Sequence, residues 1–150
     1  HTLVERIGFL NPTYRERLQL QFSDDISITT NAFLDPVFLR SILENLVTNA
    51  LKYSEANSKA FLSVNIKLSG NDEMIEFKIK NKIGKIGHPE MDKIFTRYYR
   101  ADAAQGYSGT GLGLWLANQQ AKEMGSSIDC SFDELWTTFS FQVPKMNALT

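Results

Sequence analysis

The chain has 150 residues, enough for one ordinary domain with a hydrophobic core, and its apolar and charged fractions of 43% and 22% are typical of soluble globular proteins. Its formal net charge of −1 gives no electrostatic reason to expect nucleic acid or an anionic membrane as a partner. The single cysteine, Cys130, excludes an internal disulfide, and no spacing of cysteines and histidines suits zinc.

We expect a cytoplasmic module without direct membrane contact, because no apolar run approaches membrane-spanning length and no signal peptide precedes the domain. The chain begins at His1, without methionine, and enters a helical segment at once. No repeat, low-complexity tract or linker interrupts it. One domain is therefore expected over residues 1–150, excised from a larger multidomain protein.

The first third of the chain is predicted to be mostly helical. Residues 3–21 have a helical pattern with a break at Asn11-Pro12, and a short β-rich run follows over residues 26–30. Asp35 and Pro36 then open the strongest predicted helix, as its N-cap and first residue. Its core-facing stripe has helical spacing and consists of Leu39, Ile42, Leu43, Leu46, Val47 and Ala50.

A β-hairpin is predicted next. Residues 61–68 alternate between apolar and polar side chains, residues 69–72 form a turn, and a second strand follows. The inward-facing side chains are predicted to be Leu62, Val64, Ile66, Leu68, Ile75, Phe77 and Ile79. The other face is predicted to be wet, since the second strand places Glu76, Lys78 and Lys80 there.

The C-terminal half is predicted to alternate loops with regular elements. In order, these are a loop (81–89), a short helix (90–100), an aperiodic mobile loop (101–108), a helix (112–124) ended by Gly125, and two strands (128–132 and 138–143). Phe139, Phe141 and Val143 are predicted to face inward from the last strand. The fold class is therefore α+β, a two-layer sandwich of largely antiparallel strands with about three helices on one face.

Three polar residues share one face of the strongest predicted helix. Asn45, Asn49 and Lys52 fall within about 60° of one another, because each helical residue advances by 100°. Amide oxygens suit Mg²⁺, which also binds phosphate oxygens, and Lys52 could add a positive charge toward phosphate. Taken alone, these residues are explained by a solvated polar face; the glycine run described next favours a ligand site.

That glycine run is SGTGLGL, residues 108–114, where three alternate glycines open a helix. Such a backbone can fold around a phosphate with its N–H groups directed at the anion. The run is not a Walker A motif, because the chain contains no GxxxxGK(S/T). It is not a Rossmann fingerprint either, because Leu114 stands where the third glycine would be and a predicted loop, not a strand, precedes the run. The preceding segment IFTRYYR, residues 94–100, carries Arg97 and Arg100, which could reach phosphate, although an ordinary amphipathic helix also explains it.

The order and spacing of these segments resemble the ATP-binding catalytic domain of sensor histidine kinases. That domain has the Bergerat fold of the GHKL superfamily, shared with gyrase B, Hsp90 and MutL. ENLVTNALKYS (44–54) resembles the family's N box, IFTRYYR its F box, SGTGLGL its G2 box and TTFSFQVP (137–144) its closing strand. The resemblance covers residues 3–144, and the N and G2 boxes are specific as a pair.

The resemblance implies a set of site residues that bind ATP and Mg²⁺. Asn49 would be the Mg²⁺ ligand with Asn45 assisting, and Asn49, Lys52 and Arg97 would act in catalysis. Residues 101–108 would form the ATP lid, and Thr138 would lie near the adenine. The full implied nucleotide site consists of Asn45, Asn49, Lys52, Tyr53, Asn81, Gly84, Ile86, Phe95, Arg97, Tyr98, Ser108, Gly109, Thr110, Gly111, Leu112, Gly113, Leu114 and Thr138.

One box departs from the family's pattern. The G1 box is usually DxGxG, whose aspartate accepts a hydrogen bond from the adenine amino group, but Asn81 stands at that position here. The glycines are displaced to Gly84 and Gly87. An asparagine carbonyl can still accept from an amine, but without the charge that roughly doubles the strength of such a bond. Weaker adenine binding or an altered base preference is therefore expected.

The resemblance favours a kinase over an ATPase. ATPases of the superfamily carry a glutamate four residues before the Mg²⁺-binding asparagine, where this chain has Asn45, and Glu44 points about 100° away. The implied activity is transfer of the γ-phosphoryl group to a histidine on a separate dimerisation domain, and then to a response regulator. Neither His1 nor His88 fits the acceptor pattern, so the domain alone should be nearly inactive.

Two alternatives stay open from the sequence. One is a degenerate kinase domain that works as a non-enzymatic interaction module, and the altered G1 box supports it. The other is a stand-alone ATPase or serine kinase of the same fold. Nucleic acid is not an expected partner, and the parent protein could be anchored in the inner membrane.

Overall fold

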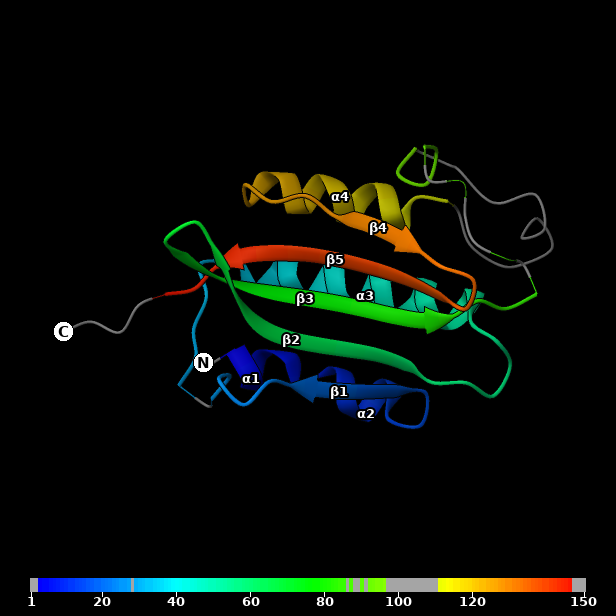
Figure 1. Cartoon of the computed structure of the whole chain (residues 1–150), viewed down its shortest axis with the longest axis horizontal. Coiled ribbons are helices and arrows are strands. Elements are labelled where there is room, and N and C mark those ends of the chain that lie inside the picture. The colour runs from blue at the N-terminus through cyan, green and yellow to red at the C-terminus, as the bar shows by residue number, and fades with distance from the viewer. Residues whose placement is uncertain are drawn as a thin grey trace.

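The computed structural model describes residues 3–27, 29–85, 87, 90, 92–96 and 111–146. Within these residues, five strands form one mixed sheet (Figure 1). The strands are β1 (Leu18–Phe22), β2 (Ala60–Ser69), β3 (Asp72–Lys82), β4 (Asp129–Phe132) and β5 (Trp136–Pro144). Their order across the sheet is β1-β2-β3-β5-β4, with β1 parallel to β2 and every other pair antiparallel.

The helices are α1 (Leu3–Ile7), α2 (Leu10–Tyr14), α3 (Pro36–Tyr53) and α4 (Gly113–Glu123). Figure 1 shows α3 running behind β3 and β5, and α3 packs against β2, β3, α1 and α4. The predicted α+β sandwich is therefore confirmed, with one face of the sheet covered by helices. No helix among the described residues is long and apolar enough to cross a membrane.

The long helix α3 begins and packs as its sequence predicts. The Asp35 carboxylate accepts hydrogen bonds from the N–H groups of Val37 and Phe38, at 2.8 and 3.3 Å, and Pro36 occupies the first helical position. All six predicted core positions of this helix are at most 1% exposed. The apolar stripe is therefore the face of α3 that packs into the core, and the opposite face is left toward solvent.

Large apolar side chains on the helix-covered face of the sheet form the centre of the core. Phe77 of β3 lies opposite Phe141 of β5, and their rings stack with centroids 4.7 Å apart and planes 10° apart. Phe139 is buried beside them, as predicted. Because strand side chains alternate, these positions also determine which residues face the open side.

Several predictions about the elements are wrong. Residues 18–22 form a strand, because Leu18 to Phe22 pair with β2, a partner distant in sequence. The described residues of the predicted strand 26–30 lie in turns, with Ile26 N–H donating to the Ser23 carbonyl and Thr30 N–H to the Ser27 carbonyl. Of the helix predicted over 90–100, residues 92–96 form turns instead. Glu76 is only 6% exposed, because its carboxylate lies between Lys67 and Lys78.

The end of α4 is confirmed. Gly125 has φ +73°, and the N–H groups of Gly125 and Ser126 donate to the carbonyls of Lys122 and Ala121. This pair of bonds is the Schellman motif, in which a glycine adopts the left-handed conformation after the last turn.

Leu68, which was predicted to face inward, is 68% exposed, because it lies at the end of β2 beyond the core.

Candidate functional site

The C-terminal half of α3 and the first turn of α4 meet at one end of the molecule, where the tip of β3 also lies (Figure 1). A Cβ atom at Gly113 would lie 2.9 Å from Oδ1 of Asn45, closer than real Cβ contacts. Nδ2 of Asn45 donates to the Ser41 carbonyl at 3.0 Å, which leaves Oδ1 turned toward α4. Glycine at position 113 therefore allows the start of α4 to approach the Asn45 amide.

The polar face predicted on α3 lies along this contact. Asn45, Asn49, Lys52 and Tyr53 are all half-buried, and the first three follow one another by about one turn. Nζ of Lys52 lies 5.4 Å from the centroid of the Tyr53 ring. Two amide groups and one cation are thus arrayed on the side of α3 that continues from Gly113.

The first turn of α4 is suited to an anion. Gly111 has φ +75°, a conformation that glycine adopts readily, and it turns the chain into the helix. Leu112 at the N-cap gives no side-chain hydrogen bond to the first turn, so the N–H groups that begin the helix are not capped by it. These groups and the positive end of the helix dipole can bind a phosphate.

Two buried polar residues end the apolar ladder between β3 and β5. Asn81, 2% exposed, pairs with Thr137, 4% exposed, directly beyond the pair of Ile79 and Phe139. Nδ2 of Asn81 donates to the Lys82 carbonyl at 3.1 Å. A pair of polar groups is therefore held at the helix-covered face, next to the C-terminal end of α3.

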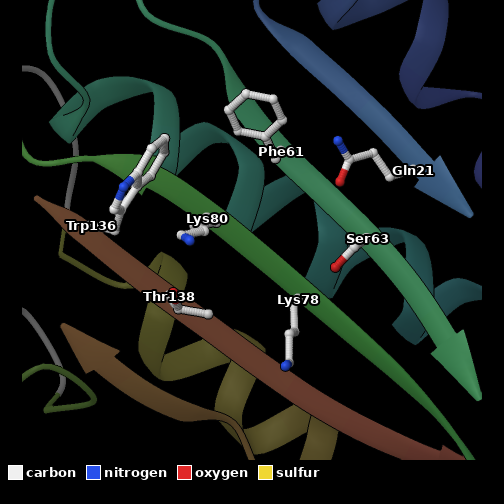
Figure 2. A pocket seen from close by; sticks show the side chains of 7 residues that line it. All are labelled: Gln21, Phe61, Ser63, Lys78, Lys80, Trp136 and Thr138. Carbon is white, nitrogen blue, oxygen red and sulfur yellow. The ribbon is translucent and has the colours of Figure 1, made fainter. Parts of the chain in front are cut away.

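The structure does not bring Thr138 to this group. Thr138 lies on the opposite face of the sheet, where it pairs with Lys80 across β3 and β5 (Figure 2). Thr137, not Thr138, is the residue of β5 that lies beside Asn81. Strict alternation from the inward-facing Phe139 would have identified Thr137, since residues two apart in a strand share a face.

Gly84 joins the end of β3 to the end of α3. Its N–H donates to the Tyr53 carbonyl at 3.1 Å, and a Cβ there would lie 2.6 Å from the Ser54 carbonyl oxygen. Glu55 N–H donates to the Lys82 carbonyl and strengthens the same junction. Only glycine fits this approach of two backbones, which explains a glycine at a position displaced from the usual box.

Phe95 anchors residues 92–96 on the core. Its ring meets Phe139 edge to face, with centroids 6.5 Å apart and planes 81° apart, and the neighbouring Ile94 is 2% exposed. Residues 92–96 are thus anchored on the core at the same end as Asn81.

The chain matches the family described as "Histidine kinase-, DNA gyrase B-, and HSP90-like ATPase" over residues 34–147, about three quarters of its length. The chain belongs to this family. The predicted resemblance to the ATP-binding domain of histidine kinases is confirmed.

The curated relatives of this histidine kinase-type domain are sensor kinases. It is 34% identical over 114 residues to the sensor protein VanS of Enterococcus faecium, covering 75% of this chain and 28% of VanS. It is 33% identical over 132 residues to the signal transduction histidine-protein kinase BarA of Escherichia coli K12, covering 85% of this chain and 14% of BarA. The chain therefore corresponds to a minor part of each relative's length.

Solved histidine kinase domains share the fold. The catalytic domain of ThkA superposes with a TM-score of 0.71 at 19% identity, covering 96% of this chain and 93% of ThkA's. The mycobacterial sensor histidine kinase MprB gives a TM-score of 0.69 at 18% identity, covering 95% and 92%. Full-length ShkA, described as a complex with AMPPNP, gives 0.69 at 20% identity, covering 99% of this chain and 30% of ShkA's.

Several residues predicted for the nucleotide site lie outside the described residues. These are Ile86, Arg97, Tyr98, Ser108, Gly109 and Thr110, together with the predicted lid, residues 101–108, and the two histidines, His1 and His88. The described part of the site therefore comprises the N box, the end of β3, Phe95 and the start of α4.

Acidic side chains do not form a metal site in the described part of this nucleotide site. No group of three His, Cys, Asp or Glu residues that could hold a metal occurs among the described residues. A cation would depend instead on the asparagine amides and on ligand phosphates. Burial raises the pKa of the Cys130 thiol, opposite Phe139 on β5, to about 12, which disfavours the reactive thiolate.

Proposed function

We propose that this domain is the catalytic part of a two-component sensor kinase, which transfers the γ-phosphoryl group of Mg²⁺-ATP to a histidine on a separate dimerisation domain of its parent protein. A response regulator would then receive the phosphoryl group. The observation that carries the proposal is the contact between Gly113 and the Asn45 amide. It joins the phosphate-binding helix start to the amides that would hold the metal ion.

The phosphates would be bound mainly by backbone. The N–H groups of Gly113 and Leu114 begin α4 and are not capped by the Leu112 side chain. Asn49, with Asn45, would hold Mg²⁺, which neutralises charge on the phosphates when bound. Lys52, on the same side of α3, would supply further positive charge.

The adenine would be bound by Asn81 and Thr137. Because Nδ2 of Asn81 donates to the Lys82 carbonyl, its Oδ1 is the atom left to meet a ligand as an acceptor. An acceptor suits the 6-amino group of adenine and opposes the 6-oxo group of guanine. The neutral amide keeps the base preference at a lower affinity than a carboxylate would give.

The residues of α3 favour phosphoryl transfer over hydrolysis. Asn45 cannot accept a proton from water in the way that a glutamate can. The adjacent Glu44 forms an ion pair with Arg40, with 3.2 Å between Nε and Oε1, on a different face of the helix. Without a base at the site, ATP is kept for an acceptor outside this chain, and the isolated domain should turn over little ATP.

The proposal also places the domain in the cytoplasm, where ATP is available, with the parent protein anchored in the inner membrane. The alternative of a non-enzymatic module has one supporting observation, the asparagine in place of the G1 aspartate. Binding of nucleotide by this chain decides between them.

Calorimetric titration with ATP, with and without Mg²⁺, tests the site. Asn49→Ala should reduce Mg²⁺-dependent affinity at least about 100-fold, because the main proposed ligand of the metal ion that neutralises the phosphates is lost. Thr48→Ala, on the neighbouring exposed position of α3, should stay within about twofold. Absence of binding at millimolar ATP in the unmodified chain would sink the proposal and leave the interaction module.

The phosphoryl acceptor requires a second experiment. The parent protein, incubated with ATP labelled at the γ position, should acquire an acid-labile, base-stable phosphoryl group, and Asn49→Ala should abolish it. Release of phosphate into water, without a labelled protein, would instead support the stand-alone ATPase.

A further inference from the structure

The open face of the sheet holds a hollow that the nucleotide site does not use (Figure 2). Its volume is about 350 Å³, within the range of small-molecule sites. Side chains from β1, β2, β3 and β5 line it, and Figure 2 shows them projecting from the face opposite α3.

One end of the hollow is aromatic. Phe61 of β2 and Trp136 of β5 meet edge to face, with ring centroids 6.0 Å apart and planes 64° apart. Both rings are only half-buried, so part of each remains available to a ligand. Such a wall stabilises a flat apolar group by burial and ring contacts.

The rest of the lining is positively charged or a neutral hydrogen-bonding group. Lys78 and Lys80 are two residues apart on β3 and share this face, which places their Cα atoms roughly 7 Å apart. Ser63 lies opposite Lys78, and Thr138 lies opposite Lys80. Two cations and two hydroxyl groups thus lie around one space, and no acidic residue in the described part of the chain lines it.

The neighbouring carboxylates only partly balance these charges. Glu76 is 3.4 Å from Nζ of Lys78, but it lies at the same distance from Nζ of Lys67 outside the hollow. Nζ of Lys80 lies 4.7 Å from the centroid of Trp136, at the boundary between the aromatic and charged parts. Asp133, in the turn before β5, feels the charge of Lys80 but is not part of the lining.

We propose that this hollow is a second ligand site, which takes a small aromatic oxyanion, a flat ring bearing a phosphate or carboxylate. The oxyanion lies between Lys78 and Lys80 with a hydrogen bond from the Thr138 hydroxyl, which lies opposite Lys80, and the ring packs on Phe61 and Trp136. The charge and the aromatic wall together select this class over a bare anion or an uncharged ring. The site is separate from the nucleotide site, because Lys80 and Thr138 face away from Asn81 and Thr137.

Titration of the ¹⁵N-labelled chain with phenyl phosphate, followed by two-dimensional NMR, tests the proposal. Saturable shifts are expected at the amides of β2, β3 and β5 around Ser63 and Lys80, and at the indole N–H of Trp136. Lys80→Gln should weaken binding at least about fivefold, since one of the two charge-assisted contacts is lost. Inorganic phosphate and benzyl alcohol, each lacking half of the ligand, should bind at least about fivefold more weakly.

Lys67→Gln is the matched control. Lys67 of β2 lies on the same face of the sheet as Lys78 and also forms an ion pair with Glu76, but it lies outside the hollow. Lys67→Gln should therefore keep the affinity for phenyl phosphate within about twofold, while Lys78→Gln weakens it. Equal affinity in Lys80→Gln and the unmodified chain, equal binding of inorganic phosphate, or shifts confined to α3 and α4 would each overturn the proposal.

Discussion

The two faces of β3 and β5 differ in chemistry although they belong to the same strands. On the helix-covered face, Asn81 and Thr137 follow a ladder of buried aromatic and aliphatic side chains. On the open face, one residue away on each strand, Lys80 and Thr138 border a half-open hollow. A shift of one residue in register along β3 and β5 would move Lys80 and Thr138 to the helix-covered face and Asn81 and Thr137 to the open face. The register of these two strands therefore decides which polar groups each face presents.

The comparison predicts the largest change in stability for the aromatic stack. Phe77→Ala should lower the free energy of unfolding by about 3–5 kcal/mol, because a fully buried ring stacked on Phe141 leaves a cavity. Lys78→Ala, the next residue along β3 and exposed on the other face, should cost less than about 1 kcal/mol. Urea unfolding of both variants measures the difference; similar losses would show that the two faces do not differ as described.

A smaller effect is expected where β3 leaves the sheet. Gly84→Ala should destabilise the chain by about 1–3 kcal/mol, because the new methyl group would collide with the Ser54 backbone. It should also weaken ATP binding, since the C-terminal end of α3 must move. Gly8→Ala is a milder control that should cost less, because its Cβ would lie 3.2 Å from the Glu5 carbonyl oxygen, a tight contact but longer than the 2.6 Å at Gly84. Unfolding and nucleotide titration would contradict the prediction if Gly84→Ala matched the control in both.

The Asp35 cap stabilises the start of α3, the helix that covers one face of the sheet. Asp35→Ala should cost about 1 kcal/mol by leaving the N–H groups of Val37 and Phe38 without their acceptor. Asp35→Asn should restore most of that loss, because an amide oxygen can also cap. Thermal unfolding separates the two variants, and identical behaviour of alanine and asparagine would rule out the capping role.

The smallest effect concerns the turn between β4 and β5. The N–H groups of Leu135 and Trp136 donate to Oδ1 of Asp133, both at 2.8 Å, and lower the pKa of this exposed carboxyl below its ordinary value of 3.8. A lowered pKa in the folded state adds stability above pH 3.8, and that stability is lost as the pH falls through the lowered value.

An acid titration should therefore shift the amide resonances of Leu135 and Trp136 below pH 3.8. Asp133→Asn should remove this titration and keep a hydrogen-bond acceptor in the turn. Shifts that persist in Asp133→Asn would assign the titration to another group.

The sequence predicts those parts of the molecule whose signals are local. The N-cap at Asp35, the stripe of α3 and the left-handed Gly125 each depend on residues within one or two turns, and all three are confirmed. Strand β1 was missed because its partner in the sheet begins at Ala60, far along the chain. Pairing of this kind leaves no mark in a short window of sequence.

The site was predicted to a similar extent. The glycine run and the amides of α3 indicated a phosphate site, and the structure brings Gly113 and Asn45 together. Thr138 was predicted near Asn81, but β5 places Thr137 there and Thr138 on the other face of the sheet. The fit of Gly84 against Ser54 depends on two backbones that only the folded chain brings together. The open-face hollow was also not foreseen, since it combines side chains from four strands.

The parallel pairing of β1 with β2 has a consequence for how the chain folds. The two strands pair only after α3 has crossed from one to the other, so the chain between Leu18 and Ala60 must close as one long loop. The hairpin of β2 and β3, in contrast, closes through a turn at Gly70 and Asn71. Folding should therefore begin at the hairpin and α3, with the N-terminal edge of the sheet added last.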